Sequence, residues 1–136
     1  MTLRPSLRAE AAALVVDDDD AVRCIVRAIL ETAGFHIVVE AVDGTDAVAQ
    51  HRAGVFDVMV LDLQMPRQSG LEALAAIRRV ERGVGVVLVS GNPPAGLRDL
   101  IERDERLTFL PKPFGMRGLL RAVESVAGLP CTRPTL

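Results

Sequence analysis

The amino-acid sequence predicts an α/β protein built on a parallel sheet with helices on both faces. Short apolar runs, several of them rich in β-branched residues, alternate with segments in which apolar residues recur at helical spacing. Runs that are apolar throughout are typical of parallel strands, which are buried on both faces. With 136 residues, 49% of them hydrophobic, the chain is long enough for one domain with a substantial core. We expect this domain at residues 11–128, after an extension (1–10) and before a tail (129–136).

The first strand is expected at residues 11–16, an apolar run that stops at four consecutive aspartates. A helix follows, because apolar residues recur at helical spacing from Val22 to Ala33, and Gly34 is a suitable C-cap. Cys24 lies inside this helical pattern and is expected to be a small core residue.

The next three elements follow the same alternation. Residues 35–39 form an apolar run that predicts the second strand. Residues 45–53 predict the second helix, which Gly54 would close. Residues 55–61 are almost entirely apolar and predict a buried third strand.

Capping signals mark the helices of the second half. Ser69 and Glu72 have the spacing of a capping box and open a helix that continues to Val80. The apolar run at residues 84–89 predicts the fourth strand.

The last unit begins after a polar, proline-containing stretch. Asn92 as N-cap, with Pro93 at the first helical position, predicts a helix that extends to about Arg103. Residues 107–110 predict a short fifth strand, and residues 114–127 predict the last helix.

Composition excludes several classes of function. The net charge is −2 and there is no basic block, which argues against binding to nucleic acid or to an anionic membrane. Four Phe, with no Trp or Tyr, leave few side chains on which bases could stack. Two cysteines are too few for a disulfide framework. Without a signal-peptide pattern or a long apolar run, the expected localisation is the cytoplasm.

Chemically distinctive residues follow four of the five predicted strands. Asp17 and Asp18 come after the first strand, Asp62 after the third, Ser90 after the fourth and Lys112 after the fifth. In an open parallel α/β sheet, ligands bind beyond the carboxyl ends of the strands. The sequence therefore predicts that these side chains share one site.

Lys112 also stands out by composition, because it is the one lysine among 16 basic side chains, all the others being arginine. An ammonium is a compact point charge that suits a single phosphate or carboxylate oxygen, whereas a guanidinium is a planar fork. The sequence indicates a site that needs an ammonium.

The acidic residues predict a divalent cation. Asp17 and Asp18 directly follow a buried strand, where desolvated like charges need a partner. A few carboxylates, with water completing the coordination shell, suit Mg²⁺. Asp19 and Asp20 have a simpler interpretation, as solvated residues or as the N-cap of the first helix.

The motifs together resemble the receiver domain of bacterial two-component response regulators, over residues 12–127. The resemblance implies a flavodoxin-like (βα)5 fold, a doubly wound parallel sheet with strand order 2-1-3-4-5. It implies that the first and fifth helices cover one face and the other three cover the opposite face. The matching segments are Leu14–Asp18, Val60–Pro66, Ser69–Glu72, Val89–Gly91 and Pro111–Phe114.

The resemblance also assigns expected roles. Asp62 corresponds to the phosphoacceptor, a carboxylate nucleophile that takes a phosphoryl group from the phosphohistidine of a sensor histidine kinase or phosphotransfer protein. Asp17, Asp18, Asp62 and the backbone carbonyl of Gln64 correspond to the Mg²⁺ site. The domain would phosphorylate and dephosphorylate itself rather than act as a turnover enzyme.

Three further positions carry expectations from the family. Ser90 corresponds to the hydroxyl that hydrogen-bonds the phosphoryl group, and Lys112 corresponds to the ammonium that pairs with it. The Lys112–Pro113 peptide bond is expected to be cis. Phe109 occupies the position of the switch aromatic, without the hydroxyl of the Tyr often found there.

The predicted output is a protein–protein contact of a single-domain regulator, through the face formed by the fourth helix, fifth strand and fifth helix. A homodimer through the same face is the alternative. The polar faces of the first and fourth helices are either interfaces or ordinary solvated surface, and for each single residue we expect the second. These faces carry Arg23, Arg27, Glu31, Arg98, Asp99 and Glu102.

Other functions remain open. A receiver-like interaction module that is never phosphorylated would use the same fold. An aspartyl-phosphate phosphohydrolase would need a second acid two residues after the nucleophile, where this chain has Gln64. A cofactor-binding flavodoxin-like module would need a phosphate cradle after the first strand, and four aspartates there would repel phosphate.

Overall fold

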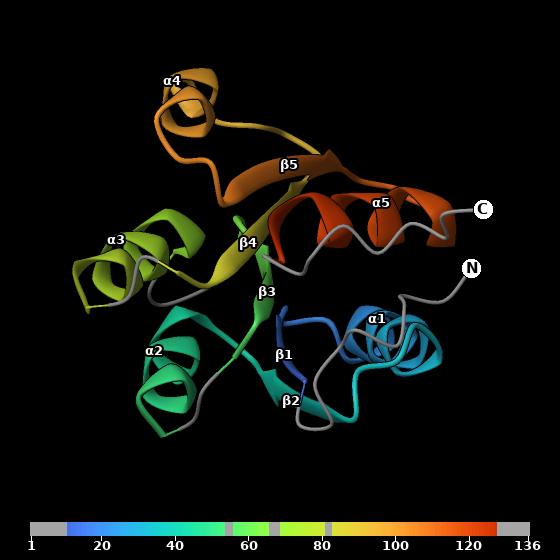
Figure 1. The fold of residues 1–136 in the computed structure, drawn as a ribbon. Coiled ribbons are helices and arrows are strands. Elements are labelled where there is room, and N and C mark those ends of the chain that lie inside the picture. Colours follow the sequence, from blue (N-terminus) through green and yellow to red (C-terminus); the bar gives the residue numbers. More distant parts are fainter. Residues whose placement is uncertain (1–10, 54–55, 66–68, 81–82, 128–136) are drawn as a thin grey trace.

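The described part of the protein is an α/β sandwich of five parallel strands and five helices (Figure 1). The computed structural model describes residues 11–53, 56–65, 69–80 and 83–127, so the predicted extension, the tail and the predicted helix end at Gly54 lie outside it. The strands are β1 (Ala12–Val16), β2 (Ile37–Ala41), β3 (Val58–Asp62), β4 (Gly85–Ser90) and β5 (Leu107–Pro111). The helices are α1 (Asp20–Thr32), α2 (Gly44–Ala53), α3 (Gly70–Val80), α4 (Leu97–Glu102) and α5 (Met116–Val126).

The sheet has the order β2-β1-β3-β4-β5, with every pair parallel, which confirms the predicted topology. Helices α1 and α5 lie on one face, and α2 and α3 lie on the other (Figure 1). The chain reverses its winding after β2, so the carboxyl ends of β1 and β3 are adjacent at the switch point. Ligand sites of open α/β sheets form at such a point.

Two apolar cores fill the space on either side of the sheet. Alternate residues of one strand point to opposite faces, so Val15 belongs to the core under α1 and α5 and Leu14 to the core under α2 and α3. Helix α1 contributes Val26 and Leu30 to the first core. Because the central strands are covered on both faces, every residue of β1, β3 and β4 is buried.

The end of α1 explains why β2 begins two residues later than the sequence predicted. Gly34 has φ 112°, a conformation that favours glycine, and its N–H donates to the carbonyl of Glu31. The N–H of Phe35 donates to the carbonyl of Leu30, which completes a Schellman motif. Phe35 therefore belongs to the helix cap, with its ring in the core, and β2 covers residues 37–41 instead of 35–39.

Helix α4 is also shorter than predicted, since it begins at Leu97 and not at Pro93 after an Asn92 N-cap. A residue that precedes proline avoids the helical region, and Pro93 precedes Pro94, so two consecutive prolines delay the helix. Its N-cap is Gly96, at φ 84°, without a side-chain cap. Helix α5 likewise begins late, at Met116, behind an N-cap Gly115 that provides no side-chain cap.

Two expectations for α1 are wrong. Cys24 is exposed rather than part of the core. Arg23, predicted on the solvated face, is buried, because it lies on the same stripe of the helix as Val26 and Leu30. Asp19 is the N-cap of this helix, and its carboxylate accepts the N–H groups of Ala21 and Val22. Among the described helices, none combines the length and apolar character needed to cross a membrane.

Candidate functional site

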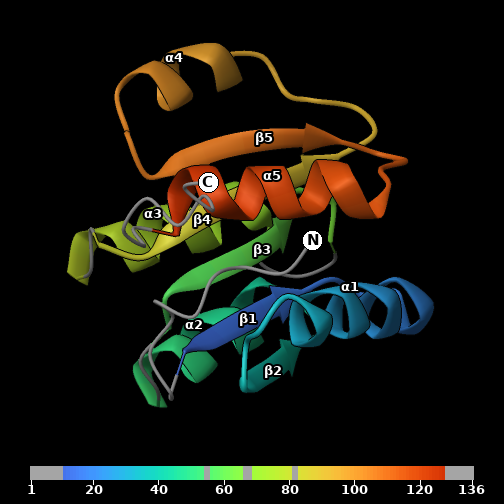
Figure 2. The same cartoon turned by 45° about the vertical axis from the view of Figure 1, so that its right-hand side comes forward.

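The carboxyl ends of four strands carry the polar residues of the candidate site. All the strands point the same way, so these ends gather at one edge of the sheet (Figure 2). Asp17 follows β1, Asp62 ends β3, Ser90 ends β4 and Lys112 follows β5. Asp17 and Asp62 are each 4% exposed and Ser90 is 0% exposed, although all three are polar.

Asp17 is held by hydrogen bonds on its backbone and its side chain. Its N–H donates to the carbonyl of Ala41 at the end of β2, 3.1 Å away. One carboxylate oxygen, Oδ1, accepts the N–H of Asp19 at 2.9 Å. The other, Oδ2, accepts the ammonium of Lys112 at 3.1 Å. The side chain of Asp17 is therefore fixed between the loop that precedes α1 and the residue that follows β5.

Asp62 lies beside Asp17 and faces the same ammonium. Its Oδ1 accepts the N–H of Gln64 at 3.0 Å, and its Oδ2 lies 3.5 Å from Nζ of Lys112. Burial raises the pKa of Asp62 above its ordinary value, and the negative charge of Asp17 adds to this, against the opposing effects of Gln64 and Lys112. Extra positive charge at this site would therefore be favourable.

Lys112 is positively charged at neutral pH in this position. Burial alone would lower the pKa of Lys112, but its hydrogen bond and charge interaction with Asp17, and then those with Asp62, hold the pKa above its ordinary value. The Lys112–Pro113 peptide bond is cis, as expected. The chain turns here between β5 and α5, and the ammonium reaches back over the sheet edge to both carboxylates.

The acidic side chains fit a divalent cation. Asp17, Asp18 and Asp62 each offer a carboxylate oxygen, and these atoms lie within 4.8 Å of one another. Two of the three residues are buried, and Asp18 is exposed, which leaves a solvent side where water could complete a coordination shell. Together with Lys112, the three carboxylates leave two net negative charges, which a hard cation such as Mg²⁺ would neutralise.

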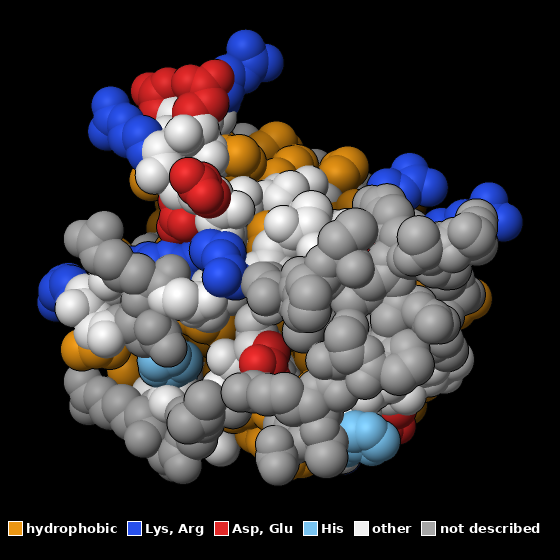
Figure 3. Space-filling view, viewed as in Figure 1, with side chains coloured by type: hydrophobic (Ala, Val, Ile, Leu, Met, Phe, Trp, Pro, Cys, Tyr) orange, Lys and Arg blue, Asp and Glu red, His pale blue; other side chains and the backbone are white. Residues whose placement is uncertain are grey.

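Ser90 and Phe109 lie on neighbouring strands. Oγ of Ser90 accepts the N–H of Asn92 at 2.9 Å, and Ser90 follows Val89, which pairs with Asp62. Phe109 is half-buried and lines a groove of about 500 Å³ between α4 and β5, with Leu97 and Ile101 of α4. Charged side chains of both signs gather over α4, with hydrophobic surface beside them toward β5 (Figure 3).

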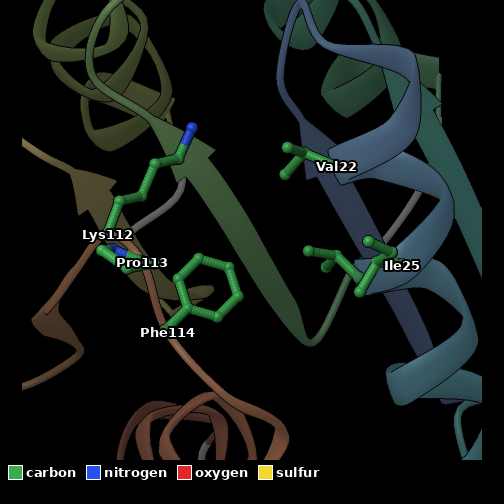
Figure 4. Close-up of a pocket in the computed structure, with 6 residues that line it drawn as sticks. Val22, Ile25, Lys112, Pro113 and Phe114 are labelled. Atoms are coloured by element: carbon green, nitrogen blue, oxygen red, sulfur yellow. The ribbon is translucent and has the colours of Figure 1, made fainter.

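A second groove, of about 410 Å³, opens between α1 and the loop that joins β5 to α5. The ring of Phe114 faces Val22 and Ile25 across it, and Lys112 turns its amino group away from Phe114 (Figure 4). Its lining is otherwise apolar, and Ile25 is 58% exposed. The groove therefore shares Lys112 with the acidic site, where the Lys112 ammonium lies 3.5 Å from Asp62.

Sequence reasoning missed two contributors to the site. Gly70, the first residue of α3, leaves no room for a side chain, because a Cβ there would lie 2.4 Å from the carbonyl oxygen of Asp62. Arg23 donates to the carbonyl of Asp17. Its spacing of three and seven residues from Val26 and Leu30 is the signal that would have placed it inside.

Comparison with known proteins identifies the family. The family model of the response regulator receiver domain matches residues 13–124. The chain belongs to this family. Receiver domains accept phosphoryl groups, bind Mg²⁺ in an acidic pocket, and interact with histidine kinases and downstream targets.

Individual relatives cover most of the chain. The chemotaxis protein CheY of Listeria monocytogenes is 33% identical over 115 residues, which is 84% of this chain and 96% of the relative. The receiver domain of a sensor histidine kinase from Pseudomonas aeruginosa, solved with a magnesium ion in its active-site cleft, is 26% identical with a TM-score of 0.74, over 87% of this chain and 98% of that one. The CheX–CheY–BeF₃–Mg²⁺ complex from Borrelia burgdorferi is 28% identical with a TM-score of 0.76, over 85% and 88% of the two chains.

Proposed function

We propose that this protein is a response regulator in which Asp62 accepts a phosphoryl group from the phosphohistidine of a histidine kinase or phosphotransfer protein. The observation that carries the proposal is the placement of Asp62. Its carboxylate is buried at the end of β3, with one oxygen held by the N–H of Gln64 and the other facing the ammonium of Lys112. A carboxylate fixed in this way is a positioned nucleophile.

The chain's own groups supply most of what the transfer needs. A carboxylate oxygen of Asp62 forms a bond to phosphorus while the bond from phosphorus to the donor's imidazole nitrogen breaks, and the imidazole leaves with its electron pair. Lys112 balances negative charge on the phosphoryl oxygens, and the hydroxyl of Ser90 is the hydrogen-bond donor proposed for one of them. When bound, Mg²⁺ neutralises further charge; Asp17, Asp18, Asp62 and the carbonyl of Gln64 would hold it.

The apolar groove beside Lys112 supports a protein donor. A donor histidine must bring its ring to Asp62, and the groove between α1 and Phe114 is lined in part by Lys112, whose ammonium faces Asp62. Its exposed Ile25 gives a partner helix an apolar surface to bury next to the reacting atoms. We assign this groove to the phosphodonor protein.

Phosphorylation with a small-molecule donor tests the proposal. Incubation with acetyl phosphate and Mg²⁺ should add one phosphoryl group, detected by intact-protein mass spectrometry, and Asp62→Asn should abolish the addition. The exposed Asp99 of α4 is the matched control, so Asp99→Asn should label like the wild type. Labelling that survives Asp62→Asn, or that does not need Mg²⁺, would contradict the proposal.

Two other outcomes would favour the alternative functions. A protein that binds Mg²⁺ but is labelled by neither acetyl phosphate nor a kinase would be an unphosphorylated interaction module. Continuous release of phosphate from a small ester such as p-nitrophenyl phosphate would indicate a phosphohydrolase. We expect neither, because the residue two positions after Asp62 is Gln64 and not an acid.

A further inference from the structure

Arg23 connects the buried side of α1 to the backbone of the acidic site. Its side chain is 10% exposed. Nη1 donates to the carbonyl oxygen of Asp17 at 2.7 Å, and Nε donates to Oε1 of Glu40 on β2 at 2.9 Å. Nη2 pairs with the carboxylate of Asp20, one turn earlier on the same helix. One planar guanidinium therefore joins a backbone carbonyl to two separate carboxylates.

The backbone carbonyl of Asp17 is held by a contact of its own, in addition to the contacts of the N–H and the carboxylate. The N–H and both carboxylate oxygens of Asp17 are held by Ala41, Asp19 and Lys112. Arg23 adds the fourth contact, and this contact acts on the peptide group that joins Asp17 to Asp18. A rotation of that peptide would move the two carboxylates relative to each other, and both belong to the acidic cluster.

The guanidinium of Arg23 is itself oriented by Glu40 of β2. Glu40 uses its second oxygen, Oε2, to accept Nη1 of Arg27 at 2.8 Å, and Arg27 also pairs with Glu31 at 3.1 Å. Hydrogen bonds from Arg27 and Arg23 hold the pKa of Glu40 below its ordinary range, so this carboxylate is charged at neutral pH. The contacts form a continuous chain from the surface of α1, through β2, to the carbonyl of Asp17.

We propose that Arg23 is a positioning residue that sets the Asp17–Asp18 peptide so that both carboxylates meet at one divalent cation. The inference rests on the proposed function, because the cation is the one used in phosphoryl transfer. It assigns Arg23 no contact with the cation or the phosphoryl group. A lysine at this position would keep the charge but could not make three contacts in the directions of a planar fork.

Arg78 provides a control within the same molecule. Its side chain is 16% exposed, and it pairs with Asp104 at 2.8 Å. It also donates to the carbonyls of Val84 and Arg106 at 2.7 and 3.0 Å. These partners precede β4 and β5, at the opposite edge of the sheet from the acidic site. Arg78 thus makes the same kinds of contact as Arg23, and the partners described for it lie at the other edge of the sheet from Asp17.

The test compares Arg23→Lys with Arg78→Lys in the full chain. For each protein, Mg²⁺ is titrated while the amide signals of residues 17–20 are followed by NMR, and the free energy of unfolding is measured in urea. We expect Arg23→Lys to weaken Mg²⁺ binding about tenfold, the low end of what loss of an orienting contact costs. Arg78→Lys should lose stability and keep the wild-type affinity for Mg²⁺.

Phosphorylation by acetyl phosphate gives a second readout. If Arg23 acts through the cation site, excess Mg²⁺ should restore the labelling rate of Arg23→Lys to within about twofold of the wild type. Should Arg23→Lys not fold, Glu40→Gln keeps the arginine but removes the charge that orients it, and should weaken Mg²⁺ binding by a smaller factor, about threefold.

The outcomes separate this inference from the proposed function. Unchanged Mg²⁺ affinity in Arg23→Lys, or in Glu40→Gln if that variant is used, would overturn the positioning role and leave Asp62 as the phosphoacceptor. Equal weakening in Arg23→Lys and Arg78→Lys would also overturn it, because the effect would then follow stability. A wild-type protein that does not bind Mg²⁺ would overturn both the proposed function and the inference.

Discussion

At the scale of single residues, the site depends on charged side chains that are buried close together. Asp17 and Asp62 are almost completely buried beside each other, and Lys112 is the cation that contacts both. Burial, and to a lesser extent the charge of Asp17, raises the pKa of Asp62 above its ordinary value. A divalent cation, with or without a phosphoryl group, would offset this cost by placing positive charge beside the two carboxylates.

Replacement of the one lysine tests whether the site needs an ammonium. Lys112→Arg keeps the charge, but a guanidinium cannot place one point charge 3.1 Å from Asp17 and 3.5 Å from Asp62. We expect phosphorylation by acetyl phosphate to slow about tenfold, the effect of losing one hydrogen bond worth about 1.4 kcal/mol. The rate is followed by mass spectrometry. A wild-type rate would show that any positive charge is sufficient.

The residues after the strands could be found from the sequence because strand direction alone brings them to one edge. Asp17, Asp62 and Lys112 needed only the strand ends and the rule for ligand sites in open sheets. Arg23 and Gly70 could not be found in this way. Arg23 depends on which side of α1 faces β2, and Gly70 depends on how closely α3 approaches the backbone of Asp62.

At the scale of elements, α1 is joined to β2 by ion pairs as well as by the apolar core. Arg23 and Arg27 of α1 both bond to Glu40 of β2. Because the folded state lowers the pKa of Glu40, its ionised form contributes stability above the ordinary carboxyl pKa of about 4.3. That contribution is lost as the pH falls through the lowered pKa.

Glu40→Gln should therefore destabilise the protein in a pH-dependent manner. We expect a loss of about 1 kcal/mol in the free energy of unfolding at pH 7, since hydrogen bonds to charged groups are replaced by weaker ones. The difference from the wild type should shrink as the pH falls from about 5 toward about 3. Urea unfolding across this range checks it, with Glu102→Gln on the exposed face of α4 as the control. A difference independent of pH would mean that Glu40 acts through packing alone.

A glycine sets how closely α5 approaches β4. A Cβ on Gly85 would lie 1.9 Å from the carbonyl oxygen of Val126, at the end of α5, and backbone atoms cannot move aside cheaply. Gly85→Ala should cost about 3 kcal/mol of unfolding free energy. Gly118→Ala, inside α5 and with only ordinary contacts, should instead stabilise by about 0.5 kcal/mol. Thermal or urea unfolding of the two variants would contradict this if their effects had the same sign.

The elements themselves were predictable where periodicity and caps agree. The capping box of Ser69 and Glu72 forms, with Ser69 N–H donating to Glu72 and Glu72 N–H donating to Ser69. Errors arose where a different local hydrogen bond replaced the one that the sequence pattern predicted. Phe35 is a residue type common in strands, but its N–H caps the end of α1. Asn92 is a residue type common at N-caps, but its N–H donates to the hydroxyl oxygen of Ser90.

At the scale of the whole molecule, the acidic site and the surface of α4 are connected through two strands. Ser90 ends β4 next to Val89, which pairs with Asp62, and Leu88, two residues before Ser90, pairs in register with Phe109 of β5. Phe109 in turn lines the groove against α4. A displacement of Ser90 toward a phosphoryl group would therefore change the packing of Phe109 through the paired strands β4 and β5.

Output through α4, β5 and α5 is the last prediction. The ring of Phe109 is half-buried, so turning it inward would gain about 1 kcal/mol, part of the 1.5–3 kcal/mol for full burial. That is enough to shift a two-state surface whose states differ by about as much. We expect beryllofluoride, a phosphoryl mimic, to change amide NMR shifts in the Mg²⁺-loaded protein across residues 91–121 as well as at the site.

Two variants distinguish Asp62, where the change begins, from Phe109, through which it would reach α4. Asp62→Asn should abolish all of these shifts, whereas Phe109→Leu should keep those near Asp62 and reduce those over α4, because a smaller side chain gains less on burial. Shifts confined to the acidic site in the wild type would contradict the route. If the shifts over α4 grow with protein concentration, the same face joins two copies of the chain. If they do not, the groove with Phe109 is left free in the phosphorylated state for a different protein.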